Sequence, residues 1–238
     1  MTLPRVESDI PGSYQLDALL RGRALQRAWH RARLELIAQL LPPRRDAWSL
    51  DLAAGSGIVS WRFPEARVVS VDMRLDACRT IHGHSPGRPV MVAELGQLPV
   101  RSAVFSQVYF LETLEHLTVE QGRRILEEAR RVSCAGAGCL ITTPNYRSHW
   151  MLLEGLLDAL RLTPPLGNGQ HVSRYDRGSL VGAIQGTGWR VVQVGSFNLL
   201  APLIGSVSRA AGDWMVNVEA RRCGSTGALL YALCEAGS

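Results

Sequence analysis

The stretch of sequence that decides the fold of this chain is LDLAAGSG, residues 50–57. It continues an apolar segment that starts at Trp48, and a helical pattern over residues 57–64 follows at once. Glycine adopts backbone conformations that other residues avoid and lets a ligand approach the backbone closely. In an open parallel sheet, ligands bind at the carboxyl ends of the strands. The stretch therefore predicts a strand that ends in a ligand-binding turn.

Strands and helices alternate around this turn. Apolar segments typical of strands occupy residues 48–54, 68–71, 90–93, 104–111 and 139–143, and helical patterns occupy residues 57–64, 74–83 and 119–133. Such alternation indicates βαβ units with right-handed crossovers, which build a parallel sheet. We predict an α/β fold with a seven-stranded, mostly parallel sheet and helices on both faces, completed by strands near 189–197 and 227–234.

The flanking segments are helical. Leucines and alanines recur at three- and four-residue steps over residues 14–41, which predicts an N-terminal helix that ends at Pro42. Residues 147–163 predict an amphipathic helix inserted after the fifth strand, and another helix is expected near 176–187. The apolar residues 199–222 carry no pattern that assigns them to an element.

Composition limits the class of protein. Hydrophobic residues make up 46% and charged residues 20% of the 238, as in soluble globular proteins. The net charge is +5, but all 26 basic residues are arginines and they are scattered, so a nucleic-acid partner is not expected. The five cysteines form no CxxC pair, and the first residues have no apolar signal core. We therefore expect a cytoplasmic protein with reduced thiols.

Asp72 is the second residue that suggests a ligand, because it ends the expected strand at 68–71. A carboxylate there can accept hydrogen bonds from both hydroxyls of a ribose, a role that dinucleotide and adenosyl ligands share. A dinucleotide fingerprint needs a third glycine, which is absent after Gly57. Asp51 would also repel a pyrophosphate, whereas a cationic sulfonium amino acid tolerates its charge.

Taken together, these motifs resemble the class I S-adenosylmethionine-dependent methyltransferases, in particular the group that includes ubiquinone- and menaquinone-biosynthesis enzymes. The resemblance covers about residues 48–145 and includes LEHL at 114–117 and Thr143-Pro144-Asn145. It implies a Rossmann-like fold with S-adenosylmethionine as cofactor. Ala53 replaces the family's usual first glycine, and Ser106 departs from the usual Phe-Asp at the start of strand four. The residues expected around the cofactor are Asp51, Ala53, Gly55, Gly57, Asp72, Met73, Glu94, Leu95 and Leu111.

The resemblance also implies a domain organisation. We expect a single methyltransferase domain over residues 1–238, with a helical cap at 14–41 and a cofactor-binding core at 46–145. A helical insertion at 146–175 would act as a lid, and residues 176–238 would supply the C-terminal helix and strands.

Two histidines are candidates for catalysis. Methyl transfer needs a base only when the acceptor carries a proton, and histidine suits that task near neutral pH. His116 follows strand four, and His171 lies in a loop after the insertion, with Tyr146 and His149 as weaker candidates for the same wall. No spacing of histidines and carboxylates typical of a metal site occurs, so no metal is expected.

The acceptor is poorly specified by the sequence. Leucines in the insertion and in residues 197–206 suggest a hydrophobic small molecule (quinone-, lipid- or polyketide-like), methylated at oxygen or carbon. The same leucines could instead pack on the domain core. A peripheral membrane contact, a non-catalytic methyltransferase-like binding protein and a nucleic-acid methyltransferase remain as alternatives, and oligomeric state cannot be inferred.

Overall fold

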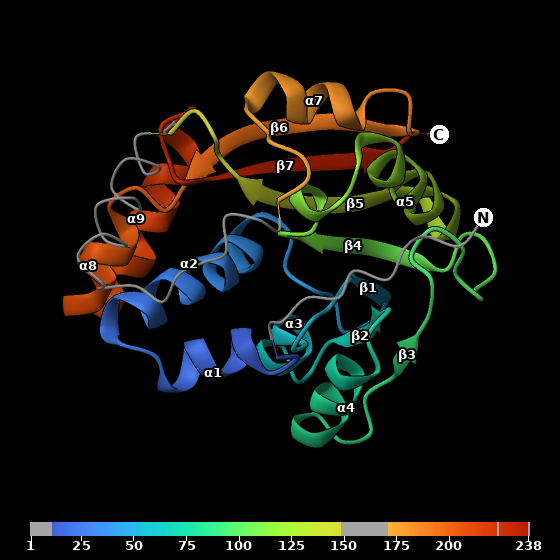
Figure 1. Cartoon of the computed structure of the whole chain (residues 1–238), viewed down its shortest axis with the longest axis horizontal. Helices are drawn as coiled ribbons and strands as arrows, with labels where there is room; N and C mark the ends of the chain where they lie inside the picture. The colour runs from blue at the N-terminus through green and yellow to red at the C-terminus, as the bar shows by residue number, and fades with distance from the viewer. Residues whose placement is uncertain (1–10, 149–170, 223, 238) are drawn as a thin grey trace.

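A computed structural model describes residues 11–148, 171–222 and 224–237 of the chain (Figure 1). Residues 149–163 of the expected helix, which include His149, therefore lie outside the described residues. The strands are β1 (Trp48–Leu52), β2 (Arg67–Asp72), β3 (Val90–Val92), β4 (Phe105–Leu111), β5 (Ser133–Pro144), β6 (Trp189–Phe197) and β7 (Leu229–Ala236). The helices are α1 (Tyr14–Arg21), α2 (Ala24–Leu40), α3 (Ile58–Arg62), α4 (Leu75–His84), η1 (Leu114–His116), α5 (Val119–Val132), α7 (Arg177–Ile184), α8 (Ala201–Val207) and α9 (Arg209–Arg222).

The strands form one seven-stranded sheet in the order β3-β2-β1-β4-β5-β7-β6. Neighbours from β3 to β5 pair in parallel, and β7 is antiparallel to both β5 and β6. Because β7 alone is reversed, β6 runs in the same direction as the first five strands. The prediction of a mostly parallel α/β sheet is confirmed, and the carboxyl ends of β1, β2 and β4 meet at one edge.

Two hydrophobic cores, one on each face of the sheet, hold the helices in place. One contains Ile125 and Leu126 of α5 and Leu180 of α7, and the other contains Leu36 of α2 and Val216 of α9. In Figure 1, α2, α8 and α9 group together, apart from α5 and α7. Helices therefore cover both faces, as the sequence predicted.

The N-terminal helix differs from the prediction, because the helix expected over 14–41 is two helices. Gly22 takes an extended conformation between α1 and α2, and a Cβ there would lie 2.4 Å from the carbonyl oxygen of Ala18. The break lets α1 turn back over the ligand-binding turn, where the Leu16 N–H donates to Ser56 Oγ at 3.0 Å. The N-terminal segment thus contacts the turn directly.

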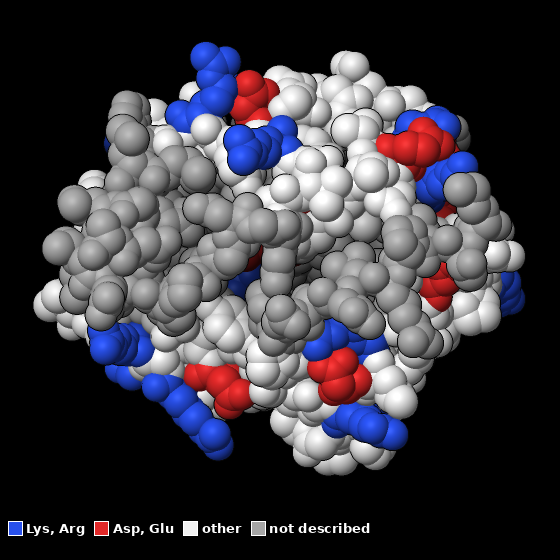
Figure 2. All heavy atoms as spheres, in the orientation of Figure 1, with Lys and Arg blue, Asp and Glu red and all other residues white. Residues whose placement is uncertain are grey.

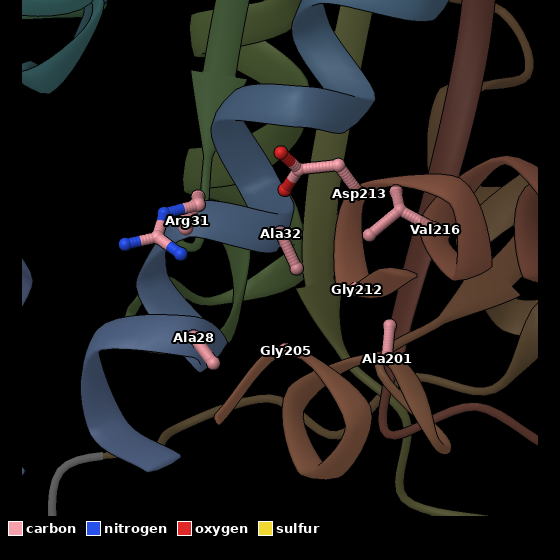
Figure 3. Close-up of a pocket in the computed structure, with 8 residues that line it drawn as sticks. All are labelled: Ala28, Arg31, Ala32, Ala201, Gly205, Gly212, Asp213 and Val216. Carbon is pink, nitrogen blue, oxygen red and sulfur yellow. The ribbon is translucent and has the colours of Figure 1, made fainter. Parts of the chain in front are cut away.

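Two further differences concern the C-terminal half of the chain. β5 begins at Ser133, six residues before the expected start at 139. The unassigned residues 199–222 form the α8–α9 pair, in which Gly205 and Gly212 let the helix backbones approach closely. Figure 3 shows the contact of this pair with α2, where small side chains leave a hollow of only about 10 Å³.

Within the described parts of the chain, no helix is long and apolar enough to cross a membrane.

Candidate functional site

The turn after β1 has an unusual backbone. Ala53, Gly55 and Gly57 all have positive φ, at 58°, 54° and 67°. The left-handed conformation costs a non-glycine residue about 1–2 kcal/mol, so Ala53 stores strain in this turn. A Cβ on Gly57 would lie 2.7 Å from Cγ1 of Ile81, so only glycine fits there. The strained, small-residue turn is the kind of backbone that accommodates a ligand.

Asp72 at the end of β2 holds this turn in place. Its Oδ2 accepts a hydrogen bond from the Gly55 N–H at 2.8 Å, and its Oδ1 accepts one from the Arg74 N–H at 2.9 Å. Burial raises the pKa of the Asp72 carboxyl, although these two N–H groups act in the opposite direction. A carboxylate offers about four acceptor positions, so the two bonds leave capacity for the hydroxyls of a ribose.

Asp51 lies on the neighbouring strand and is 3% exposed. Its Oδ2 is buried and has no hydrogen-bond partner among the described residues. Burial, and then the nearby Asp72, raise the pKa of the Asp51 carboxyl to about 8. An unbonded buried carboxylate oxygen costs stability unless a ligand satisfies it. The Asp51 oxygen is therefore suited to bind a cationic group at this edge.

The remaining residues expected around the cofactor follow the same edge. The Ala93 N–H donates to the Asp72 carbonyl at 3.1 Å, which brings the segment containing Glu94 beside the end of β2. Glu94 is half-buried, whereas Leu95 is buried in the core and Met73 packs against that core. Leu111 ends β4 and packs in the core on the opposite face. Their contact with a cofactor remains a prediction.

A buried ion pair at the end of β4 was not expected from the sequence. Arg33 of α2 is 1% exposed, and its Nη1 lies 2.8 Å from Oε2 of Glu112. Its Nη2 contacts Nδ1 of His30, whose pKa is lowered to about 2 by burial and then by Arg33. Arg33 Nε and Glu112 Oε1 are buried without partners among the described residues, and Glu112 has a φ of 47°. Strain and unbonded charged atoms coincide here, as they commonly do at functional sites.

The fold brings His116 and His171 together beside this ion pair. Their ring centroids are 5.0 Å apart, and the hydroxyl of Tyr146 bonds to Nδ1 of His171. The N–H groups of Val172 and Ser173 donate to the Glu115 carbonyl at 2.7 and 3.0 Å, which fixes the His171 loop to η1. Burial, followed by His116 and Arg174, lowers the pKa of His171, so its ring is neutral near pH 7.

Glu115 is the third residue of the group that contains His116 and His171. It is 2% exposed, and its Oε2 accepts a hydrogen bond from Thr143 Oγ1 at 3.0 Å. Burial, and then Glu112, raise the pKa of Glu115 to about 8. One ligand atom each from Glu115, His116 and His171 lie within 4.8 Å of one another. Sequence spacing did not reveal this cluster, because His171 reaches it only through the fold.

Two hollows between described residues lie away from the carboxyl edge. The hollow in Figure 3 is lined by residues of α2, α8 and α9, and a wider one of about 250 Å³ lies near Pro43 and Phe63. Neither includes any described residue that the sequence placed around the cofactor. The candidate site is therefore the polar edge at the ends of β1, β2 and β4.

These features define an α/β protein with a glycine turn and two buried carboxyl groups, Asp51 and Asp72, at the carboxyl edge of its sheet. Residues 50–141 match the family model described as a methyltransferase domain. No curated protein sequence matches the chain. The chain has the fold of the class I S-adenosylmethionine-dependent methyltransferases, and the resemblance inferred from its sequence is confirmed.

Solved structures agree on the fold at low sequence identity. An S-adenosylmethionine-dependent methyltransferase from Archaeoglobus fulgidus is 16% identical with a TM-score of 0.64, over 93% of this chain and 98% of that one. A chain from the complex of the Haloferax volcanii Trm112 methyltransferase activator with a protein described as a methyltransferase is 17% identical. Its TM-score is 0.64, and the match covers 97% of this chain and 100% of that one. Another S-adenosylmethionine-dependent methyltransferase, from Thermotoga maritima, is 12% identical with a TM-score of 0.64, over 90% and 91% of the two chains.

Proposed function

We propose that this protein transfers a methyl group from S-adenosylmethionine to a small-molecule acceptor, at oxygen or carbon. The observation that carries the proposal is the pair of carboxylates at the strand ends beside the glycine turn. Asp72 has acceptor capacity for the ribose, and the unbonded Oδ2 of Asp51 suits the cationic amino-acid part. The buried Arg33, with its unbonded Nε, offers a partner for the carboxylate of the same amino acid.

A dinucleotide cofactor fits these residues less well. A pyrophosphate would meet the Asp51 carboxylate at the turn, and no third glycine follows Gly57 to bring backbone close to it. Thermal-shift measurements separate the two cofactors. S-adenosylhomocysteine should raise the melting temperature and NAD should not, whereas a shift with NAD alone would reject the proposal.

The acceptor would react beside His116 and His171. In-line displacement at a sulfonium needs alignment of the acceptor and exclusion of water more than covalent help from the protein. An acceptor hydroxyl or acidic carbon also has to lose a proton, and the neutral ring of His171 next to His116 is placed to receive it. In the tautomer in which the Nδ1–H of His171 donates to the Tyr146 hydroxyl oxygen, Nε2 would be the accepting nitrogen.

The described wall of this site is polar, which restricts the reactive end of the acceptor. Arg33, Glu112, Glu115 and the two histidines supply charge and hydrogen bonds, so the methylated group would be a hydroxyl or an acidic carbon. Within residues 197–206, Phe197 and Ala201 pack in the core, while Leu200 and Leu203 are 48% and 44% exposed. A quinone-, lipid- or polyketide-like body attached to such a polar end remains our proposal.

The arrangement of the arginines does not favour a nucleic-acid partner. On the face shown in Figure 2, the arginines lie in separate groups, several of them beside acidic residues. Ion pairs such as Arg44–Asp46 and Arg123–Glu127 occur among the described residues. The described arginines visible in Figure 2 do not form a continuous basic track for a nucleic acid. A peripheral membrane contact would use Val207 of α8, which is 91% exposed.

The experiment that tests this function is a screen for transfer of a tritiated methyl group to phenols, quinones, sugars and lipids. The matched control is Asp72→Ala, which removes the ribose acceptor. The expected result is transfer to at least one hydroxylated or enolisable compound, lost in the variant. Tight cofactor binding without transfer to any acceptor would favour a non-catalytic binding protein.

A further inference from the structure

We propose that Glu115, His116 and His171 form a binding site for one divalent transition-metal ion of the zinc type. One ligand atom from each residue lies within 4.8 Å of the other two. Two imidazoles and one carboxylate are a donor set that binds zinc and related ions, and a three-residue set leaves positions open for another ligand. The inference rests on the proposed function, because it assigns the open positions to the methyl acceptor.

The surroundings of the three residues match those of protein metal ligands. Metal-binding histidines usually have the other ring nitrogen hydrogen-bonded, which fixes the ring orientation. His171 has this arrangement in the tautomer in which its Nδ1–H donates to the Tyr146 hydroxyl oxygen, which leaves the Nε2 lone pair for an ion. The carboxylate of Glu115 is similarly held by Thr143 Oγ1 at 3.0 Å.

The backbone also prepares the site before any ion binds. Val172 and Ser173 donate their N–H groups to the Glu115 carbonyl, and Ser173 Oγ donates to the Leu117 carbonyl at 2.6 Å. These three bonds attach the loop that carries His171 to the segment that carries Glu115 and His116. The donors from distant parts of the chain are therefore held together without the help of a metal.

Charge favours a cation at this position. Glu115 is 2% exposed, and burial of a carboxylate is expensive unless a cation or hydrogen bonds compensate it. Arg33 pairs with Glu112 at 2.8 Å and acts on Glu115 only as a nearby charge, which lowers the pKa of Glu115 less than burial and Glu112 raise it. Arg174 lies over the Tyr146 ring, with its guanidinium carbon 5.4 Å from the centroid. An ion bound by the three residues would compensate the Glu115 charge directly.

The chemistry of such a site fits a chelating acceptor, such as a catechol or an enolised dicarbonyl. A bound divalent ion lowers the pKa of an oxygen ligand, so the acceptor hydroxyl releases its proton to solvent on coordination. The coordinated oxygen would then form its bond to the methyl carbon as the carbon–sulfur bond breaks, leaving neutral S-adenosylhomocysteine. With a metal ion bound, the acceptor hydroxyl would therefore lose its proton to solvent and not to a ring nitrogen of His171.

The test is a titration of the chelator-stripped full chain with Co²⁺, followed by visible absorption. The parent protein should bind one equivalent and develop ligand-field bands, and Zn²⁺ should displace the Co²⁺. His171→Gln should weaken Co²⁺ binding by about 100-fold, and Tyr146→Phe by about 10-fold, because partners of metal ligands affect affinity by such factors. His82→Gln is the matched control, since His82 is exposed on α4 away from the cluster.

Glu115 is buried, so Glu115→Gln serves as a second variant only if circular dichroism and cofactor binding show that it folds. Equal Co²⁺ affinity in His171→Gln and His82→Gln, or no stoichiometric binding by the parent protein, would overturn the inference. Calorimetric binding of S-adenosylmethionine to the stripped protein separates the two proposals. Cofactor binding without Co²⁺ binding rejects the metal site alone, whereas Co²⁺ binding without cofactor binding rejects the proposed function.

Discussion

Replacing Asp51 with asparagine should stabilise the protein while it weakens the cofactor site. The pKa of this carboxyl is about 8 in the fold, against 3.8 as its ordinary value. A group whose pKa is raised by folding contributes stability below its unfolded pKa, and this contribution is lost as the pH rises through the folded pKa. Between pH 4 and pH 8 the parent protein should therefore lose stability that Asp51→Asn retains.

The size of the effect follows from the shift. Each pKa unit corresponds to about 1.4 kcal/mol, so keeping Asp51 protonated at pH 7 costs on the order of 4 kcal/mol. The asparagine side chain is also polar and is buried at the same place. The gain in the free energy of unfolding should therefore not exceed this cost of keeping Asp51 protonated. We expect Asp51→Asn to raise the free energy of unfolding by roughly 2–4 kcal/mol at pH 7, and by little at pH 4.

The assay is urea unfolding of the cofactor-free protein at several pH values between 4 and 9. Asp17→Asn on the exposed part of α1 is the matched control and should follow the parent curve. The same Asp51→Asn protein should bind S-adenosylmethionine about 10–100-fold more weakly, because a hydrogen bond to a charged group is worth about 1.5–3 kcal/mol. Parallel stability curves for the parent protein and Asp51→Asn would refute the assignment of a buried, unsatisfied carboxylate.

Three further substitutions test the turn, the C-terminal helices and the acceptor side. Gly57→Ala should lower the free energy of unfolding by more than Gly87→Ala. Both glycines have positive φ, but only at Gly57 would a Cβ meet the side chain of Ile81. Equal losses of stability in thermal unfolding would contradict this steric argument. Glu219→Gln should cost about 1.5–3 kcal/mol in urea unfolding, because the buried carboxylate accepts three backbone N–H groups at the start of α8. His171→Gln should slow methyl transfer by about 100-fold or more with cofactor affinity unchanged, and an unchanged rate would remove His171 from the acceptor side.

The ligand turn and the sheet could be predicted because their signals are local. The strand, the small residues and the glycines at 50–57 are contiguous, and Asp72 stands at the end of the next strand. By contrast, the apolar periodicity of residues 14–41 continues across Gly22, so the break between α1 and α2 leaves no signal in the pattern. The start of β5 was missed because glycine and small residues at 135–138 carry no strand pattern.

The acceptor side could be predicted only in part, because its contacts are long-range. His116 and His171 were each named as candidates for catalysis, and the fold places their rings together. Arg33 was not expected, since nothing in an amphipathic helix distinguishes a buried, paired arginine from a solvated one. The α8–α9 pair was missed for a similar reason: it depends on the close approach of Gly205 and Gly212, which is not a periodic feature.

The central claim, that this edge binds S-adenosylmethionine, is tested most directly by isothermal titration calorimetry. The parent protein should bind S-adenosylmethionine, S-adenosylhomocysteine should compete with it, and NAD should not bind. Asp72→Ala should weaken the affinity at least about tenfold, because it removes a charged acceptor of ribose hydrogen bonds. Asp46→Ala, at an exposed position before the amino end of β1, should leave the affinity unchanged. The account would be contradicted if the parent protein failed to bind millimolar S-adenosylmethionine, or if Asp72→Ala bound it as tightly as the parent.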